Sequence, residues 1–283
     1  MTVQHSPASP RTAARTTARG GPGRTPAGPA APAAAADPGA AAATAEEAVA
    51  RVRDTLERVF AAVERTREAA ERIVGGARAA GAAPSTADLA ALRPLLLRQL
   101  AEHAPLISGA GFVAEPGSLA DAPAWLEWWQ PGPDGAPRPL RLHLDPDRSA
   151  YADYTHWDWF AIPRTTGQRA VSGPYVDYLC SDEYSLTLAA PVTVGGEFAG
   201  IAAADVYLRH FEAAVRPVLR RLPAPACLVN ARGRIAASNT ARHVAGSLLR
   251  GVDPAAVPGT GAHRQGGLEL RRCGTLPLVL VTG

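Results

Sequence analysis

The chain has 283 residues, of which 47% are hydrophobic, so it can build one large or two small domains with apolar cores. The net charge of +3 lies in the first 43 residues, which hold four arginines and one aspartate. The rest of the chain is neutral. This argues against a general nucleic-acid-binding surface, because such a surface needs a positive field.

The cysteines and the lack of long apolar runs indicate the cellular compartment of the protein. Cys180, Cys227 and Cys273 are odd in number and lack metal-ligand spacing, which predicts neither a disulfide framework nor a zinc site and favours a reducing compartment. No run reaches the roughly 18 apolar residues of a membrane span. Residues 2–30 are interrupted by Pro, Gly, Ser, Thr and Arg where a secretory signal needs an apolar stretch. We therefore expect a soluble, cytoplasmic protein.

The first segment, 1–43, consists mainly of Ala, Pro, Gly, Thr and Arg and contains no leucine or aromatic residue. Such a segment cannot bury enough apolar surface to offset the entropy of ordering. We expect a flexible tail here.

A long helix is expected to begin at a capping box formed by Thr44 and Glu47 and to end at Gly75-Gly76. Residues at alternating steps of three and four form a heptad seam along it: Val49, Val52, Leu56, Val59, Val63, Thr66, Ala70 and Ile73. Such a seam is typical either of a parallel homodimer through residues 45–74 or of a helix that packs on its own domain. The sequence leaves both interpretations open.

A second, shorter helix is expected from Ser85 to about His103. Asp88 stands three residues after Ser85, which is the spacing of another capping box. The leucines that follow supply its apolar face: Leu92, Leu95, Leu96 and Leu100. Together the two helices make an N-terminal helical segment over 44–104.

Beyond Pro105, short apolar runs broken by Gly and Pro predict β-strands. The expected strands are 107–114, 124–130, 140–144, 184–194 and 198–206. Turn residues at 131–135 and at Gly195-Gly196 join neighbouring strands, and the pattern becomes helical again over 206–219. Helices followed by a strand meander indicate an α+β fold for the segment 105–221.

The remaining segment, 222–283, repeats this kind of pattern on a smaller scale. Strands are expected at 226–229, 235–238, 267–271 and 277–281, with a short helix that ends near Leu249. We therefore expect a second, smaller module.

All five tryptophans and all six tyrosines lie between residues 125 and 207, although only 6% of the chain is aromatic. Acidic residues are interleaved with them: Asp158, Asp177, Asp182, Glu183 and Asp205. Core packing accounts for part of the rings. Because ring faces attract cations and carboxylates bind ammonium groups, the segment also predicts a pocket for a small molecule.

Asp205 is the most informative of these acids, because it ends the apolar run from Phe198 at a place where a buried strand would continue with an apolar residue. A carboxylate there needs a partner, and a ligand ammonium group would serve. Capping of the next helix through the amide of Tyr207 or Leu208 would satisfy the carboxylate equally well. Both roles are compatible, since the side chain has two oxygens.

In this order and spacing, the motifs resemble the Cache family of sensory domains, in the double-module form with a long N-terminal helix. The resemblance covers the segments 151–160, 173–177, 186–192 and 200–206. It implies a PAS-like, antiparallel-sheet Cache module that binds the ligand at 105–221 and a second, smaller PAS-like module at 222–283.

In amino-acid-binding members of this family, aromatic residues and an arginine grip the ligand, and a late aspartate holds its ammonium group. By this resemblance Trp159 and Phe160 take the paired aromatic positions, Tyr175 the loop position and Asp205 the ammonium position. The full set of expected ligand-binding residues also includes Tyr151, Trp157 and Asp177. The chain has Trp157 where that subfamily places its arginine, which favours an amine or quaternary ammonium ligand. Arg164 is an alternative source of the missing positive charge.

Catalytic and metal sites have weaker support. Cys180 and His156 would act as nucleophile and base only if the fold brought them together, and no local signature surrounds the cysteine. His143, Asp145 and Asp147 offer metal-binding atoms, but Asp-Pro-Asp-Arg is more typical of a turn. We expect no catalytic residue, no metal and no cofactor.

The expected function is therefore that of a sensor. It would bind an amine or amino-acid-like metabolite and signal through a separate partner, such as a transcription regulator, with no direct binding to nucleic acid. The alternative is an enzyme that turns over a small molecule in the same pocket.

Overall fold

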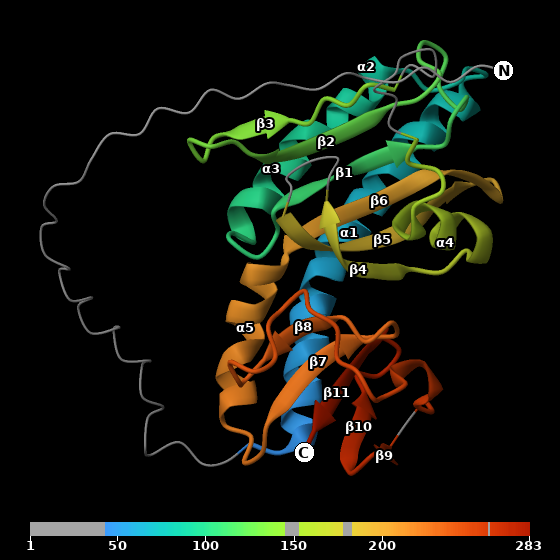
Figure 1. Ribbon diagram of the computed structural model, residues 1–283. Coiled ribbons are helices and arrows are strands. Elements are labelled where there is room, and N and C mark those ends of the chain that lie inside the picture. The colour runs from blue at the N-terminus through green and yellow to red at the C-terminus, as the bar shows by residue number, and fades with distance from the viewer. Residues whose placement is uncertain (1–42, 145–152, 178–182, 260) are drawn as a thin grey trace, which may run out of the picture. The chain divides into compact units, whose positions relative to one another are not determined.

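The computed structural model describes residues 43–144, 153–177, 183–259 and 261–283 (Figure 1). The two sheets and the helices beside them belong to one compact unit, Gly39–Gly283. A long N-terminal helix is followed by a six-stranded and then a five-stranded antiparallel sheet. This confirms the predicted α+β class with a larger and a smaller module. The predicted flexible tail lies outside the described residues, apart from Ala43.

The first helix, α1 (Ala45–Ala79), begins at the predicted capping box: Thr44 Oγ1 accepts from the Glu47 amide at 3.1 Å, and Glu47 Oε2 accepts from the Thr44 amide at 2.8 Å. Its predicted end at Gly75-Gly76 is wrong, because the helix continues for another turn. A methyl group at Gly75 would lie 3.6 Å from Val194, an ordinary van der Waals distance, so this part of the helix packs beside the first sheet. Tertiary packing here outweighs the poor helix propensity of glycine.

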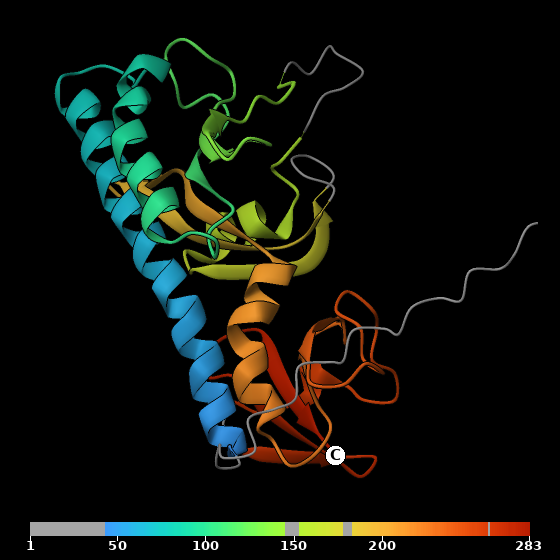
Figure 2. The same ribbon diagram turned by 90° about the vertical axis from the view of Figure 1, so that its left-hand side faces the viewer.

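The heptad seam of α1 is buried within the chain. Val52, Leu56, Val59, Val63 and Ala70 are between 0% and 1% exposed and belong to the same apolar cluster as the sheet residues. Figure 2 shows α1 running beside the first sheet. The structure therefore shows the second of the two interpretations, a helix packed on its own domain. These side chains are not available to a partner helix, so the seam supports no homodimer through residues 45–74.

The predicted second helix is divided into three pieces: α2 (Thr86–Leu89), a 3₁₀ turn (Ala90–Leu92) and α3 (Arg93–Glu102). Its capping box between Ser85 and Asp88 is confirmed. The break falls where Pro94 enters the first turn of α3, because proline has no amide hydrogen to continue the preceding helix.

The first sheet has the strand order β3-β2-β1-β6-β5-β4, with every neighbouring pair antiparallel. Its strands are β1 (Gly109–Ala114), β2 (Leu126–Pro131), β3 (Pro137–Pro139), β4 (Ala170–Asp177), β5 (Glu183–Val194) and β6 (Glu197–Tyr207). The predicted hairpin around residues 131–135 exists, but its second strand is the short β3 rather than 140–144. Helix α4 (Asp158–Thr166) and strand β4 were not predicted.

The second sheet has the order β8-β7-β11-β10-β9 and follows α5 (Leu208–Arg220). Its strands are β7 (Ala226–Asn230), β8 (Ile235–Ser238), β9 (Ala262–Gln265), β10 (Leu268–Arg272) and β11 (Leu278–Thr282). The short helix expected to end near Leu249 is wrong, because residues 239–250 form turns. Strand β9, which pairs with β10, was not predicted.

Side chains alternate between the two faces of the first sheet. One face, with Phe112, Leu188 and Ala202, joins the cluster around α1. The other face, with Val113, Ala189 and Ala203, packs against Tyr154, Trp159 and Phe160 of the segment that leads into α4. The second face therefore collects the predicted aromatic residues on the side away from α1.

Candidate ligand-binding pocket

A small cavity lies on this second face of the first sheet. Side chains of five strands line it, together with Trp157 and Trp159 at the start of α4 and two leucines that follow β3. Its volume is about 30 Å³, which is room for one or two water molecules. A ligand as large as an amino acid therefore has to displace side chains in its wall.

Three polar side chains in the cavity wall, one each on β4, β5 and β6, form a chain of hydrogen bonds. Thr187 donates its hydroxyl hydrogen to Asp205 Oδ1 at 2.6 Å. The hydroxyl groups of Tyr175 and Thr187 lie 2.6 Å apart, so Tyr175 donates to Thr187. The arrangement holds because Thr187 is the direct cross-strand partner of Asp205 in the ladder between β5 and β6.

Burial dominates the electrostatics of the cavity. Asp205 is 8% exposed and Asp177 is 5% exposed, although both carry carboxyl groups. Burial and, second, the nearby charge of Asp177 raise the pKa of Asp205 to about 7, while the hydrogen bond from Thr187 opposes this rise. A cation in the cavity would relieve both unfavourable effects.

Asp205 does not cap the helix that follows it. Strand β6 continues to Tyr207, and α5 begins there without a side-chain cap. The amide of Tyr207 donates instead to Ser108 Oγ at 3.0 Å. The capping alternative for Asp205 is therefore wrong, and its carboxyl group faces the cavity.

The structure places five of the seven predicted site residues in the cavity wall: Trp157, Trp159, Tyr175, Asp177 and Asp205. Phe160 is fully buried behind the wall and packs edge-on against Tyr154 and Phe198, so it belongs to the core. Tyr151 lies outside the described residues. The Trp157 and Tyr175 rings meet with centroids 6.0 Å apart.

Sequence reasoning missed Trp128 and Thr187, which also line the cavity. A signal for Thr187 existed, since it is a polar residue between Leu186 and Leu188 in a strand that is otherwise apolar. For Trp128 there was only its membership in the aromatic cluster. Its orientation depends on how β2 pairs with β1.

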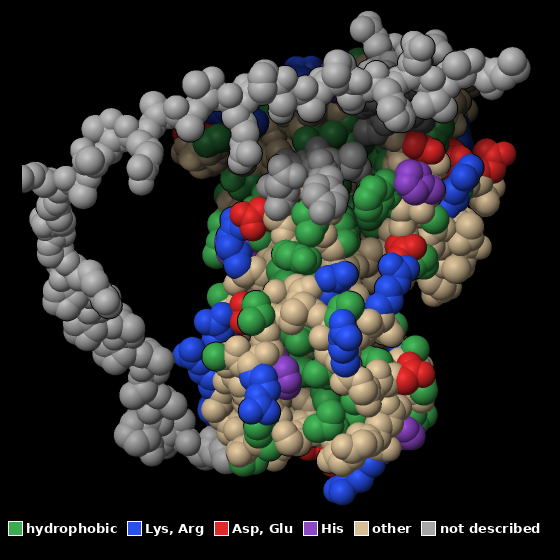
Figure 3. Space-filling model, in the orientation of Figure 1, with side chains coloured by type: hydrophobic (Ala, Val, Ile, Leu, Met, Phe, Trp, Pro, Cys, Tyr) green, Lys and Arg blue, Asp and Glu red, His purple; other side chains and the backbone are tan. Residues whose placement is uncertain are grey.

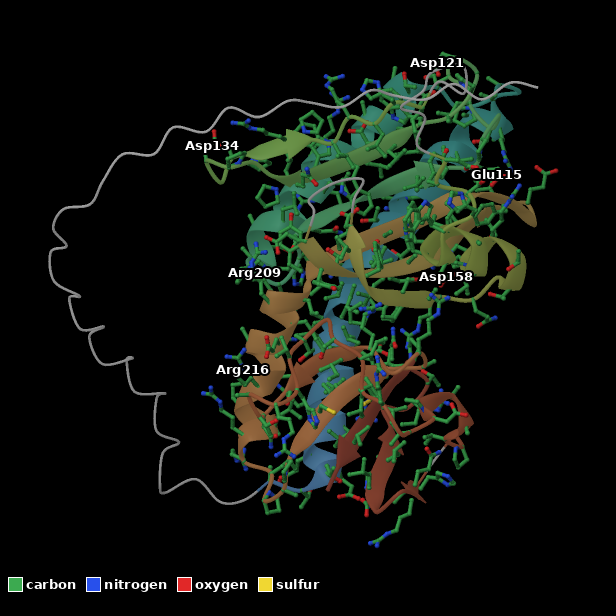
Figure 4. The ribbon with its side chains drawn as sticks, viewed as in Figure 1. Glu115, Asp121, Asp134, Asp158, Arg209 and Arg216 are labelled. Carbon is green, nitrogen blue, oxygen red and sulfur yellow. The ribbon has the colours of Figure 1, made fainter. Side chains whose placement is uncertain are left out.

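Arg164 does not supply a positive charge to the cavity. It lies on α4 and forms an ion pair with Glu115, a residue labelled in Figure 4, whose Oε1 accepts from the guanidinium group. Its side chain is 47% exposed and does not line the cavity. This alternative for the missing arginine is therefore wrong.

A wider cleft lies next to the cavity and is lined by residues of both sheets. Trp157, Trp159 and Tyr175 line both spaces, so this aromatic wall separates them. Arg232 and Asn230 enter the cleft from the turn between β7 and β8. Figure 3 shows a hollow between the surfaces of the two sheets, with basic side chains at its rim.

The weaker catalytic and metal hypotheses gain no support. Cys180, Asp145 and Asp147 lie outside the described residues, and His156 is exposed and 3.6 Å from the Asp153 carboxylate. Within the described ranges, no group of three or more His, Cys, Asp or Glu residues is arranged to hold a metal ion.

Comparisons with known proteins agree with the fold. Residues 142–213 match the family model "Methyl-accepting chemotaxis protein-like, first PDC sensor domain". This segment contains α4, β4, β5 and β6 and all seven predicted site residues. No curated protein sequence matches the chain.

Solved structures share the architecture at low sequence identity. The extracellular domain of mmHK1S-Z3, a protein named as a histidine kinase, superposes with a TM-score of 0.56 at 17% identity over 83% of this chain and 90% of that one. The ligand-binding domain of the Pseudomonas aeruginosa amino acid chemoreceptor PctC, in complex with GABA, gives 0.51 at 17% over 84% and 95%. That of PctB, in complex with L-Arg, gives 0.50 at 17% over 83% and 89%.

The matched segment and the shared fold make the chain similar to PDC-like, or Cache, sensory domains. The expected resemblance is thereby confirmed. In the part of the chain that the structure describes, no helix is long and apolar enough to cross a membrane. The cytoplasmic location stays a prediction.

Proposed function

We propose that the chain is a small-molecule sensor that binds an amine or amino-acid-like ligand in the cavity of its first sheet. The observation that carries this proposal is the burial of the Asp205 carboxyl group behind a wall of aromatic rings. A buried carboxylate is costly unless it is paired with an opposite charge. A ligand ammonium group beside Asp205 would provide that charge.

The aromatic rings suit the same kind of ligand. The Trp157 and Tyr175 rings contact each other at an interplanar angle of 42° in the cavity wall, and ring faces attract a desolvated cation. Thr187 and Tyr175 hold Asp205 in place, so the carboxyl group would not have to reorient when the ligand binds. Relatives with this fold, PctB and PctC, are named as amino acid chemoreceptors and were solved with L-Arg and GABA, which also supports an amine ligand.

Signal output is expected to pass to a separate signalling or transcription-regulating partner in the cytoplasm. Binding would widen the small cavity and thereby move α4 and β4, which supply its aromatic wall. The ligand shifts such an equilibrium only by its difference in affinity for the two states.

A thermal-shift screen of amines and amino acids tests the proposal, because a ligand that binds the folded state raises the melting temperature. Asp205→Ala should abolish the shift. Asp134→Asn is the matched control, since this exposed carboxylate in the turn before β3 pairs with Arg138 and lies away from the cavity. No shift with any amine would contradict the proposal.

The alternative, an enzyme using the same cavity, predicts a different result for the same variant. If Asp205→Ala removed turnover of a substrate while its binding survived, the carboxyl group would have a catalytic role. If ligand binding itself is lost and the wild type leaves the bound amine unchanged, as judged by mass spectrometry, the sensor proposal holds.

A further inference from the structure

Trp128 lies flat over two glycines of the neighbouring strand. A methyl group at Gly109 would come within 2.8 Å of Trp128 Nε1, and one at Gly111 within 2.8 Å of Trp128 Cε3. Gly111 is also the direct cross-strand partner of Trp128. The indole therefore reaches across β1 only because these two positions carry no side chain.

The indole N–H of Trp128 has no hydrogen-bond partner among the described residues. The side chain is 5% exposed, and Nε1 is among the few buried polar atoms in the described ranges that no acceptor satisfies. Buried donors are nearly always paired in folded proteins, so an unpaired one needs a specific explanation. Trp128 also lines the cavity, which places this donor at the proposed binding site.

Strand register brings this donor beside Asp205. Gly109 is paired with Asp205 in the ladder between β1 and β6, and directly paired residues project to the same face. Nε1 occupies the space above Gly109, so the indole N–H and the carboxyl group stand at adjacent positions on the cavity face. Oδ1 of Asp205 accepts from Thr187, and no described residue donates to Oδ2.

The indole N–H of Trp128 and the carboxylate of Asp205 need opposite hydrogen-bonding groups on a ligand. An indole N–H only donates, so it needs an acceptor oxygen and cannot bind an ammonium group. The ionised carboxylate only accepts, so it needs a donor. A ligand that satisfies both groups must carry an ammonium group and a hydrogen-bond acceptor on adjacent carbon atoms.

We propose that the cavity selects amines with an acceptor oxygen on the carbon next to the ammonium-bearing carbon, and that the Trp128 Nε1–H group recognises this oxygen. Amino acids, amino acid amides and related carbonyl compounds fit this description, whereas simple alkylamines do not. The inference rests on the proposed amine sensor and narrows its ligand class. It also gives the chain a means to recognise the oxygen without an arginine at position 157.

Matched pairs of amines test this proposal by isothermal titration calorimetry. L-Alaninamide and isopropylamine differ by a carboxamide in place of a methyl group, and glycinamide and ethylamine form a second pair. The wild type should bind each amide roughly tenfold more tightly than its alkylamine, as expected for one buried hydrogen bond whose donor is otherwise unpaired. Equal affinity within both pairs would overturn the proposal.

Variants of Trp128 test whether its indole N–H causes the preference for amides over alkylamines. Trp128→Phe should lose the preference for the amides, measured as the ratio of amide to alkylamine affinity within each pair. Trp125→Phe is the matched control, because the buried Trp125 Nε1 is also unpaired but this residue does not line the cavity. A preference that survives in Trp128→Phe would refute the assignment.

A second substitution keeps the test independent of folding. Replacing Trp128 with 3-benzothienylalanine preserves the ring shape and removes only the N–H, so loss of the preference in this variant supports the proposal and its retention overturns it. The two proposals also fail differently. If alkylamines and amides bind equally well, only the role of Trp128 is lost, whereas if none of the four amines binds the wild type, the amine sensor itself is wrong and this inference falls with it.

Discussion

Asn230 Nδ2 donates to the backbone carbonyl oxygen of Gly173 at 2.9 Å and thereby joins the two sheets. Gly173 lies in the irregular part of β4, between the register positions Ser172 and Tyr175, with a φ of 114°. Asn230 ends β7, and its Oδ1 accepts from the amides of Arg232 and Arg234. One amide side chain therefore fixes both the turn after β7 and the strand that carries Tyr175 into the cavity.

A second contact runs parallel to this one. Arg232, in the same turn, lies 3.2 Å from the carboxylate of Asp158, which stands between the cavity residues Trp157 and Trp159 and is labelled in Figure 4. Because this pair is exposed, its contribution to stability is small. The turn nevertheless contacts both elements, α4 and β4, that form the aromatic wall.

The link between the sheets predicts a loss of stability in Asn230→Ala. Removing this side chain leaves the Gly173 carbonyl and two turn amides without their partner, which should lower the free energy of unfolding by about 1–3 kcal/mol in urea titrations. Asn230→Asp separates the two contributions, because it keeps the acceptor for the turn and loses only the donor to Gly173. It should lose less than Asn230→Ala, and an unchanged unfolding midpoint in both variants would contradict the prediction.

The titration of Asp205 predicts a pH-dependent stability in the absence of ligand. Its pKa rises from 3.8 to about 7 on folding, so between these values the folded state binds more protons than the unfolded state. The free energy of unfolding should therefore fall as the pH rises through this window, by about 4 kcal/mol as an upper estimate.

Asp205→Asn isolates this effect, because asparagine keeps an acceptor for Thr187 and does not titrate. Relative to the wild type, the variant should gain stability between pH 4.5 and pH 8, measured by chemical unfolding at each pH. A difference between the two proteins that is independent of pH would show that Asp205 does not titrate in this range.

The ligand should reverse the pH dependence at the cavity. An ammonium group favours the ionised form of Asp205, so amine affinity should rise as the pH increases through about 7 and level off above it. Calorimetric titrations with L-alaninamide across this range measure the change, provided that its own ammonium ionisation is accounted for. Constant affinity would indicate that the ammonium group does not contact Asp205.

Two glycine substitutions should have opposite effects on stability. Gly109→Ala places a methyl group within 2.8 Å of Trp128 Nε1, which forces the indole to move and should cost about 1–3 kcal/mol. Gly76→Ala, inside α1, meets no atom within 4 Å and should stabilise the protein by about 0.5–1 kcal/mol. Thermal unfolding of both variants gives the comparison, and a neutral Gly109→Ala would disprove the close packing of Trp128.

The burial of the α1 seam predicts how Leu56→Ala will behave. Leu56 is fully buried within the chain, so its truncation should cost about 2–5 kcal/mol of stability and leave the oligomeric state unchanged. Light scattering after size-exclusion chromatography, together with urea unfolding, measures both quantities. A shift from dimer to monomer without loss of stability would instead place Leu56 in an interface between chains.

The sequence by itself determined the features that depend on neighbours along the chain. Both capping boxes, at Thr44 and Ser85, join residues three positions apart and formed as expected. Gly195-Gly196 likewise gave the tight turn between β5 and β6, because the two strands pair immediately on either side of it. The resemblance to Cache domains followed from ordered local motifs, and it directed attention to Asp205 and Tyr175.

The tertiary structure decided what depends on contacts between distant segments. Neither the orientation of Trp128 over Gly109 nor the neighbouring position of Asp205 can be read from one strand, since both follow from the registers of β1 with β2 and β6. The heptad seam of α1 was compatible with a second copy of the helix or with the chain's own domain as its packing partner. Only the packing of α1 on the first sheet distinguished these two possibilities. Periodicity and caps are encoded in a few adjacent residues, whereas register and the choice of packing partner are set by the free energy of the whole assembled core.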